Sequence, residues 1–308
     1  MIDQLTRDQV LVSFPGLGID EFVLNKIAFR LGSLEIRWYG ILIAMGMVLA
    51  FVYGGYRAKQ TKITFDDILD LGLFAVIFGV IGARLYYVIM EHETYHSLYD
   101  IIAIWNGGLA IYGGVIGGAI AVFCVVKYKS KKNKNMSFPL CADIILPGVM
   151  IAQALGRWGN FFNGEAYGGV VSEGSLLYFL RMGLYPNNIS GVNGMAYVHP
   201  TFLYESLWNV LGFVLINIFW KKKKFDGEAG LWYVTWYGFG RMLIEGLRTD
   251  SLYVGPIRIS QLVGFVCFVA GAAIIVWRRI VIYKNAKNTV ASTDDATEKK
   301  ENENGENN

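Results

Sequence analysis

The chain has 308 residues, of which 54% are hydrophobic and only 17% are charged. Soluble domains carry about 25% charged residues, so this composition and a mean hydropathy of +0.38 argue against a free globular protein. The formal net charge is only +3, and no basic, aromatic patch indicates a nucleic-acid partner.

The first 37 residues hold no apolar run that is long enough for a cleavable signal, since residues 11–14 are too short. We expect residues 1–37 to form an arm outside the membrane that lies against its surface. At the other end, the chain from residue 285 onward is rich in Asn, Glu, Lys and Asp and has no aromatic residue. This composition predicts a disordered cytoplasmic tail at 281–308.

Between these ends the apolar residues come in blocks. A membrane-spanning helix needs about 20 mostly apolar residues, and the segments that qualify are 38–56, 69–90, 108–126, 141–158, 202–220, 229–247 and 259–277. The sequence thus predicts an all-α integral membrane protein with about seven transmembrane helices in a domain at 38–280. The stretch 159–201, rich in Gly, Asn and Tyr, is expected to form a small extracytoplasmic head.

The basic residues indicate how the spans are oriented. Most of the 28 lysines and arginines lie at 57–62, 127–134, 221–224 and after residue 277, which are alternate connections of the seven-span scheme. Cytoplasmic loops are enriched in Lys and Arg. We therefore expect the N-terminus outside and the C-terminus in the cytoplasm.

Cysteine and histidine patterns indicate no metal or redox chemistry. Cys124, Cys141 and Cys267 lie in or beside apolar stretches, and neither a CxxC pair nor a paired-histidine spacing occurs. We expect no disulfide framework and no metal site.

A glycine-rich polar cluster ends the fourth span. Arg157, Asn160, Asn163 and Glu165 supply one cation, two amides and one carboxylate. An arginine fork suits a phosphate, and glycines let backbone approach a ligand closely. The alternative is purely structural, with Arg157 paired to Glu165 so that a helix end is tied to the head.

A second cluster ends the sixth span. Arg241, Glu245 and Arg248 fall at positions i, i+4 and i+7, which places them on one helix face. A carboxylate between two arginines can hold both and still leave positive charge for an anion. The alternative is a network that satisfies itself at the surface.

Other polar residues sit in apolar surroundings. The glycines at 113, 114, 117 and 118 form small-xxx-small pairs that allow close helix packing. They leave the phenol of Tyr112 accessible. Arg84 lies inside the second span and is expected to need an anionic partner, and Glu205, near the start of the fifth span, is well placed to meet an arginine.

These residues carry a family resemblance. The chain resembles the bacterial prolipoprotein diacylglyceryl transferases in the string Gly156-Arg157-x-Gly159-Asn160-Phe161-x-Asn163-Gly164-Glu165-x-x-Gly168. The blocks at 38–40, 107–118, 199–201 and 240–248 follow in the family's order, so the resemblance covers residues 35 to 280.

The resemblance implies a multi-pass enzyme of the bacterial plasma membrane whose site opens towards the outer face and sideways to lipid. Such an enzyme moves the diacylglyceryl group of phosphatidylglycerol to the lipobox cysteine of a preprolipoprotein and releases glycerol phosphate. The resemblance implies no cofactor. A transporter for an anionic solute and an acyltransferase are the alternatives. Against a transporter, the sequence shows no evident inverted repeats. Against an acyltransferase, its outer loops show neither a Ser-His-Asp order nor an HxxxxD pair.

The chemistry assigns roles to these positions. We expect Arg157 and Arg241 to stabilise the charge that grows on the departing phosphate. Asn160 and Asn163 would orient the headgroup, and Glu165 and Glu245 would hold the arginines. The resemblance implies that binding or catalysis also involves Tyr39 and Gly168, and we add Arg248 to the residues that bind substrate.

The sequence leaves the general base open between Tyr112, His199 and another group. Many relatives carry histidine where this chain has Tyr112, and a phenol is a weak base unless neighbouring arginines activate it. Either Tyr112 takes the thiol proton or it only positions the substrate. In the second case His199 is the alternative base.

Overall fold

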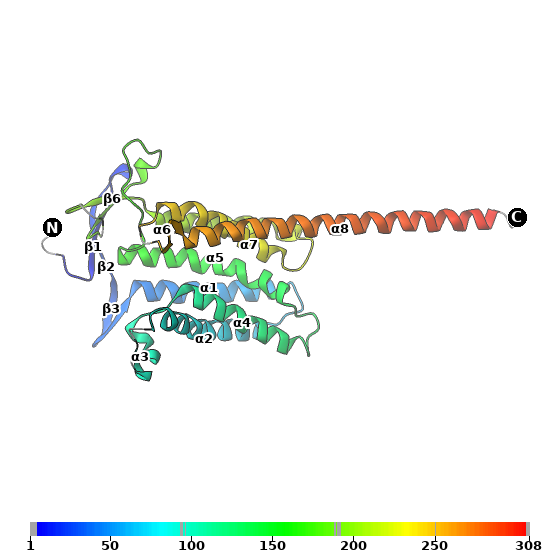
Figure 1. The fold of residues 1–308 in the computed structure, drawn as a ribbon, viewed down its shortest axis with the longest axis horizontal. Helices are drawn as coiled ribbons and strands as arrows, with labels where there is room; N and C mark the ends of the chain where they lie inside the picture. Colours follow the sequence, from blue (N-terminus) through cyan, green and yellow to red (C-terminus); the bar gives the residue numbers. More distant parts are fainter. Residues whose placement is uncertain are drawn as a thin grey trace.

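Seven long helices lie side by side in a bundle that carries a β-sheet head at one end (Figure 1). This computed structural model describes residues 5–92, 95, 97–187, 189, 192–249 and 251–305, and side chains within them up to residue 288, Asn106 excepted. The long helices are α1 (Trp38–Ala58), α2 (Phe65–Met90), α4 (Ile111–Lys129), α5 (Phe138–Asn163), α6 (Thr201–Phe219), α7 (Glu228–Ile244) and α8 (Ile259–Gly305).

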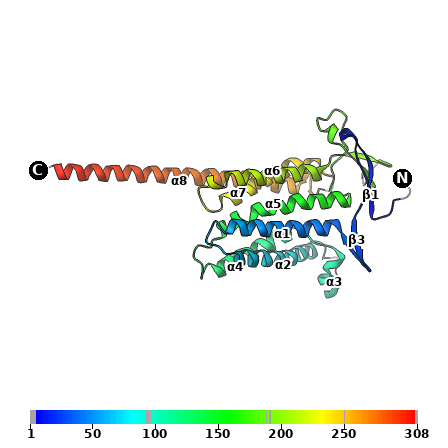
Figure 2. The same ribbon diagram turned by 180° about the vertical axis from the view of Figure 1, so that it is seen from behind.

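Six of the long helices pack as three pairs, and the α1–α5 pair lies in the centre. Helix α1 packs on α5, α2 on α4, and α7 on α8. Both views place the α1–α5 pair between α2–α4 and the group α6–α8 (Figure 2). A Cβ on Gly82 of α2 would lie 2.4 Å from the carbonyl oxygen of Gly113 of α4, which confirms the prediction that the glycines of α4 allow close helix packing.

Six helical segments of the described chain are long and apolar enough to cross a membrane: α1, α2, α4, α5, α6 with the 3₁₀ turn η6 (Trp220–Lys222), and α8. The predicted sixth span corresponds to α7, which has 17 residues. The 3₁₀ turn η7 (Glu245–Leu247) follows α7 directly, so the helical run rises about 30 Å, the thickness of the apolar bilayer core. The seventh crossing stays a prediction that this length supports.

Helix α5 is longer than the predicted 141–158 at both ends. It begins after Ser137, whose side chain accepts a hydrogen bond from the N–H of Leu140, and it ends before Gly164, which adopts a left-handed φ of 65°. The helix continues through Gly159, where a glycine lets the ring of Tyr39 approach, since a Cβ at this position would lie 2.6 Å from that ring. The polar signature at 156–163 therefore lies on a rigid helix.

The head is a four-stranded antiparallel sheet with the order β2-β1-β5-β6. Strands β1 (Gln9–Phe14) and β2 (Ile19–Asn25) come from the expected arm, and β5 (Met182–Tyr185) and β6 (Ala196–Val198) come from the expected head. Leu11 pairs with Tyr185. The two segments thus form one unit, with a core that contains Val12, Phe161 and Leu184.

Shorter elements lie at the same end as the head. Strands β3 (Ile27–Leu31) and β4 (Leu34–Arg37) form a hairpin that leads directly into α1. The others are the 3₁₀ turns η2 (Pro15–Leu17), η4 (Ile104–Asn106) and η5 (Tyr178–Leu180), the short helix α3 (Leu98–Ile102), and the strands β7 (Tyr253–Val254) and β8 (Ile257–Arg258).

Helix α8 continues to Gly305 and projects beyond the bundle at the end opposite the head (Figure 1). The prediction of a disordered tail at 281–308 therefore differs from the structure over 281–305. Ala, Glu and Lys, which are frequent in this segment, have high intrinsic helix propensity, and a helix that is already formed extends at little cost.

Candidate active site

A buried carboxylate joins three arginines from different parts of the chain. The side chain of Glu205, on α6, is only 3% exposed. Its Oε2 lies 2.6 Å from Nη2 of Arg157 and 3.1 Å from Nη1 of Arg241, and its Oε1 lies 3.2 Å from Nη1 of Arg248. The prediction that Glu205 meets an arginine is confirmed.

Glu245 adds the second carboxylate of this cluster. Nη2 of Arg241 forms an ion pair with Glu245 one turn further along, which confirms that Glu245 holds an arginine. Arg248 does not continue the helix face as predicted: α7 ends at Ile244, η7 follows, and Arg248 adopts an extended backbone. The five side chains Arg157, Glu205, Arg241, Glu245 and Arg248 carry three positive and two negative formal charges.

The three arginines are only partly shielded. Their side chains are 20%, 14% and 11% exposed for Arg157, Arg241 and Arg248, whereas both carboxylates are almost fully buried. Carboxylates that are fixed beside these cations hold the guanidinium groups in place, and the cluster keeps one more positive than negative formal charge for an anion. The arrangement can bind and stabilise a phosphate.

The amides of α5 form a second polar group next to this one. Nδ2 of Asn160 lies 3.0 Å and Nδ2 of Asn163 lies 3.1 Å from Oε1 of Glu165. Arg157 reaches the same group, with its Nη1 3.3 Å from Oδ1 of Asn160. The expected pairing of Glu165 with an arginine is wrong, because Glu205 takes Arg157 and leaves Glu165 to the amides.

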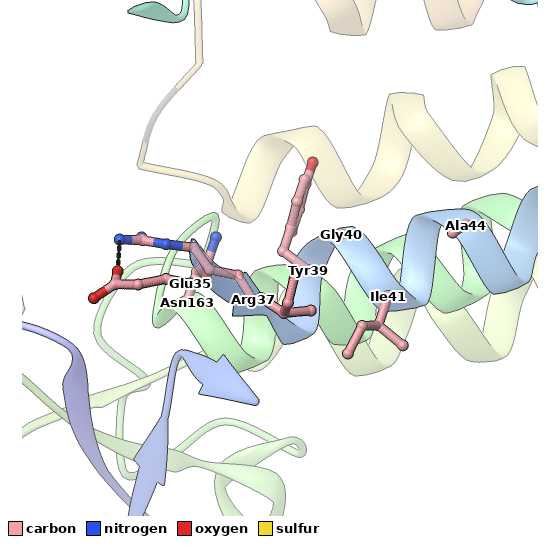
Figure 3. Close-up of a pocket in the computed structure, with 8 residues that line it drawn as sticks. Glu35, Arg37, Tyr39, Gly40, Ile41, Ala44 and Asn163 are labelled. Atoms are coloured by element: carbon pink, nitrogen blue, oxygen red, sulfur yellow. Dashed lines mark ion pairs between the residues drawn. The ribbon is translucent and has the colours of Figure 1, made fainter. Parts of the chain in front are cut away.

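An open pocket of about 570 Å³ lies beside the amides, at the head end of α1 (Figure 3). Arg37 and Glu35, whose charged groups lie 3.5 Å apart, stand at its head end, and Ile41 and Ala44 line it along the helix. Its other lining residues are Ile36, Tyr39, Gly40 and Asn163. The lining is therefore polar near the head and apolar further along α1, which suits an amphiphile.

One lining amide has an unused acceptor. Oδ1 of Asn163 is buried and has no hydrogen-bond partner among the described residues. Buried polar atoms are nearly always hydrogen-bonded, and Asn163 lines the pocket, so a small rotation of the amide would let this oxygen accept from a hydroxyl of a ligand. Tyr39 also belongs to this group, since its ring lies against α5 at Gly159.

Gly168 connects the head to the arginine cluster through its backbone. Its N–H donates to the carbonyl of His199 at 2.9 Å, and it forms a bridge with Arg248. A Cβ on Gly168 would lie 2.7 Å from Cβ of His199 and 2.9 Å from the carbonyl oxygen of Leu247. The glycine is needed for this close approach, so its role is to place His199 and Arg248.

His199 precedes α6, outside the helix. Its Nδ1 lies 3.4 Å from the hydroxyl of Tyr204. Partial burial lowers the pKa of His199 below its ordinary value, which favours the neutral imidazole at pH 7, the form that can accept a proton.

Tyr112, the second residue of α4, contacts α8. Its hydroxyl lies 3.0 Å from Oγ of Ser260, in the first turn of α8. No hydrogen bond links it to Arg157 or Arg241 in the part of the chain that the structure describes. Ser260 was not singled out by the sequence, because a serine at the start of an apolar span carries no pattern.

Arg84 has no acidic partner among the described residues, so the expectation of an anionic partner is wrong. Its guanidinium donates to backbone carbonyls of the α2–α4 connection instead. Sequence reasoning also missed that Glu205 would be shared by three arginines. Only the spacing of apolar residues was available there, and that spacing does not tell which charges meet.

Comparisons with known proteins agree with this site. A model of the family described as prolipoprotein diacylglyceryl transferase matches residues 26–277. A protein of Clostridium perfringens named phosphatidylglycerol--prolipoprotein diacylglyceryl transferase 1 is 43% identical over 258 residues, which are 82% of this chain and 94% of that protein. Proteins of Streptococcus suis and Streptococcus agalactiae named phosphatidylglycerol--prolipoprotein diacylglyceryl transferase are 45% and 46% identical, each over 83% of this chain and over 93% and 97% of their own lengths.

Proposed function

The chain belongs to the prolipoprotein diacylglyceryl transferase family, and we propose that it transfers the diacylglyceryl group of phosphatidylglycerol to the lipobox cysteine of preprolipoproteins. This is the first step of lipoprotein maturation. The observation that carries the proposal is the arginine cluster on Glu205, since the reaction must bind a phosphodiester and let it depart as a phosphate monoester.

The reaction joins sulfur to carbon. The cysteine sulfur attacks the glyceride carbon that bears the phosphodiester oxygen, the C–S bond forms, and the C–O bond breaks. The electron pair of that bond stays on the departing oxygen, so glycerol phosphate leaves with an added negative charge. The thiol proton passes to a base, because the thiolate is the effective nucleophile.

The arginines act on the leaving group. Arg157 and Arg241 approach from two helices and are held by Glu205 and Glu245, so their charge need not reorganise as the phosphate charge grows. Pre-organised charge in a water-poor site stabilises a transition state more than the same charge in water does. Arg248 adds a third cation to the clamp.

The amide group and the pocket bind the rest of the lipid. Asn163 offers its unpartnered Oδ1 to a glycerol hydroxyl, Asn160 links that amide group to Arg157, and Tyr39 borders both. Gly168 places His199 and Arg248 by its close contacts. The apolar part of the pocket along α1 then follows the direction that an acyl chain takes from the membrane surface into the bilayer.

His199 and Tyr112 are the two named candidates for the base that takes the thiol proton. His199 is neutral at pH 7 and has a hydroxyl partner. Tyr112 hydrogen-bonds Ser260. In the first case Tyr112 positions substrate at the mouth of the site, and in the second it takes the proton itself. The two assignments predict opposite results for single substitutions, which are given in the Discussion.

The proposed place of work is the bacterial plasma membrane, with the head and the site at the outer face and the C-terminus in the cytoplasm. The lysines at 127–134 and 221–224 lie at the end of the bundle opposite the sheet (Figure 1), which supports this orientation. The partners are phosphatidylglycerol, the signal peptides of preprolipoproteins and the surrounding lipid.

A reconstituted assay tests the proposal. The purified chain would be mixed with phosphatidylglycerol and a lipobox peptide, and the products analysed by mass. We expect a peptide heavier by one diacylglyceryl group together with free glycerol phosphate, and none with a peptide whose cysteine is serine. A peptide that stays unmodified, in vesicles where the protein is folded, would reject transfer. Efflux of an anionic solute from the same vesicles would then favour a transporter.

A further inference from the structure

All the donors of one buried arginine are used by backbone. Arg84 of α2 is 6% exposed, and a guanidinium has five N–H donors. Nε donates to Ile101 O at 2.8 Å. Nη1 donates to Gly107 O at 2.5 Å and to Gly108 O at 2.9 Å, and Nη2 donates to Asp100 O at 2.6 Å and to Ala103 O at 3.3 Å. The five donors thus meet five carbonyls of a single connection, and no carboxylate of the described chain takes part.

The connection is shaped around this guanidinium. Gly107 and Gly108 adopt positive φ values of 87° and 75°, which favour glycine. A Cβ on Gly108 would lie 2.5 Å from Nη1 of Arg84. The N–H of Ala110 donates to the carbonyl of Ala83, next to Arg84, at 3.0 Å. The residues that lead into α4 are therefore fastened to α2 at one point.

The outer face of the same connection has no protein support. Leu98, Tyr99, Ile102 and Trp105 are each more than 60% exposed, and α3 lies at the edge of the bundle, at the head end (Figure 1). These side chains add little packing, so the connection depends on its inner contacts, where Ala103 is fully buried. Arg84 supplies the anchoring from inside.

The connection ends two residues before Tyr112. Helix α4 begins at Ile111, and the hydroxyl of Tyr112 reaches Ser260 of α8 at 3.0 Å. Because α4 packs on α2 whereas α8 packs on α7, this contact joins two helix pairs that have different packing partners. A shift of the connection by about 1 Å would take the two hydroxyls out of hydrogen-bond distance.

We propose that Arg84 is a positioning residue. By donating hydrogen bonds to five backbone carbonyls of the 100–108 connection, it fixes the position of Tyr112 along α8, opposite Ser260. A lysine has three donors on one atom and cannot span this set of carbonyls. The part of the test that measures transfer rests on the function proposed above. The part that measures position does not.

Position is tested by photo-crosslinking. Tyr112 is replaced by p-benzoylphenylalanine in the full chain, and capture of the start of α8 is measured by peptide mass after irradiation. We expect Arg84→Lys to lower the yield at least about fivefold, the loss expected when a contact between packed neighbours is broken. Arg57→Lys is the matched control. Arg57 is also buried, bonds only neutral side chains, and lies at the opposite end of the bundle.

Gly108→Ala keeps Arg84 and tests the same contact in a second way. Its Cβ would press on Nη1 and on the ring of Tyr87, so we expect a similar fall in yield. If Arg84→Lys does not fold, as judged by gel filtration in detergent, Gly108→Ala decides the question. A yield that stays at the wild-type level in the folded variant overturns the proposal.

Kinetics separates positioning from general damage. We expect Arg84→Lys to lower kcat by about the same factor as Tyr112→Phe does, with KM nearly unchanged, and to have little further effect in a chain that already carries Tyr112→Phe. If the double variant lost kcat by the product of the two single losses, Arg84 would act independently of Tyr112, and the proposal would fail. Absence of transfer in the unmodified chain would reject the proposed function and leave the crosslinking result to decide on Arg84.

Discussion

Arg157 of α5 lies 2.6 Å from Glu205 of α6, a carboxylate that is 3% exposed. The two residues are far apart in the sequence and come from different helices. Because Glu205 also holds Arg241 and Arg248, this ion pair connects the glycine-rich signature of α5 to the polar end of α7. The site depends on a carboxylate that itself need not touch substrate.

Removal of the carboxylate should therefore disable the cluster as a whole. Breaking a buried ion pair costs about 3–5 kcal/mol, and Glu205→Gln leaves three arginines near one another with Glu245 alone. We expect transfer to fall below detection and the unfolding temperature in detergent to drop. Glu173→Gln, at an exposed head position, is the control. Normal turnover in Glu205→Gln would show that the arginines hold their geometry without it.

If arginines bind the departing phosphate, the rate of transfer should depend on the forked shape of the guanidinium group as well as on its charge. Arg157→Ala and Arg241→Ala should abolish transfer while the protein still inserts, and Arg157→Lys should retain the charge but lose the paired contacts to Glu205 and Asn160. We expect kcat of the lysine variant to fall about 100-fold, in the range seen when one stabilising donor is removed. Wild-type rates from both alanine variants would exclude the clamp.

The base can be assigned by two single substitutions. If His199 takes the proton, His199→Gln abolishes transfer and Tyr112→Phe retains much of it; the reverse holds if Tyr112 is the base. Lipidated peptide would be measured by mass at several pH values, with Tyr204→Phe as a control that removes the hydroxyl partner of His199.

The pH profile gives the sign of the histidine effect. Burial lowers the pKa of His199, so the folded protein keeps this imidazole neutral below the ordinary value of about 6.5. A base must be neutral to act, and the rate should therefore fall only on the acid side of pH 6.5. An acid limb that persists unchanged in an active His199→Gln protein would assign it to another group.

Two neighbouring glycines make a matched pair. Gly168→Ala introduces a Cβ 2.7 Å from Cβ of His199, whereas a Cβ on Gly169 would have only Leu247 O at 4.0 Å. We expect Gly168→Ala to destabilise the junction of head and bundle and to lower transfer at least about tenfold, because overpacking typically costs about 1–3 kcal/mol. Gly169→Ala should be close to wild type. Equal effects in both would mean that backbone flexibility matters more than space.

Orientation can be measured by labelling. Single cysteines at Lys132 and Glu173, in a chain whose three native cysteines are replaced, would be treated with a membrane-impermeant maleimide in intact cells. We expect label at 173 only, and label at 132 once the membrane is opened. Labelling of 132 in intact cells would reverse the proposed topology.

The sequence alone accounts for the features that depend on neighbouring residues. Apolar runs predict the long helices because each span must be apolar along its own length. The glycines at 113 and 117 predict close packing for a similar local reason. The residue types of the site, and most of their positions, were also found in the sequence.

Only the tertiary structure decided which of these residues meet. Residues 11–13 pair with β5 although about 170 residues of chain separate them. Glu205 contacts three arginines, Glu165 contacts the amides, and Arg84 binds backbone instead of a carboxylate. Such contacts depend on how the helices are placed around one another, and a charge bonds to whichever partner that placement brings within about 3 Å. Hydropathy and spacing carry no information about that distance.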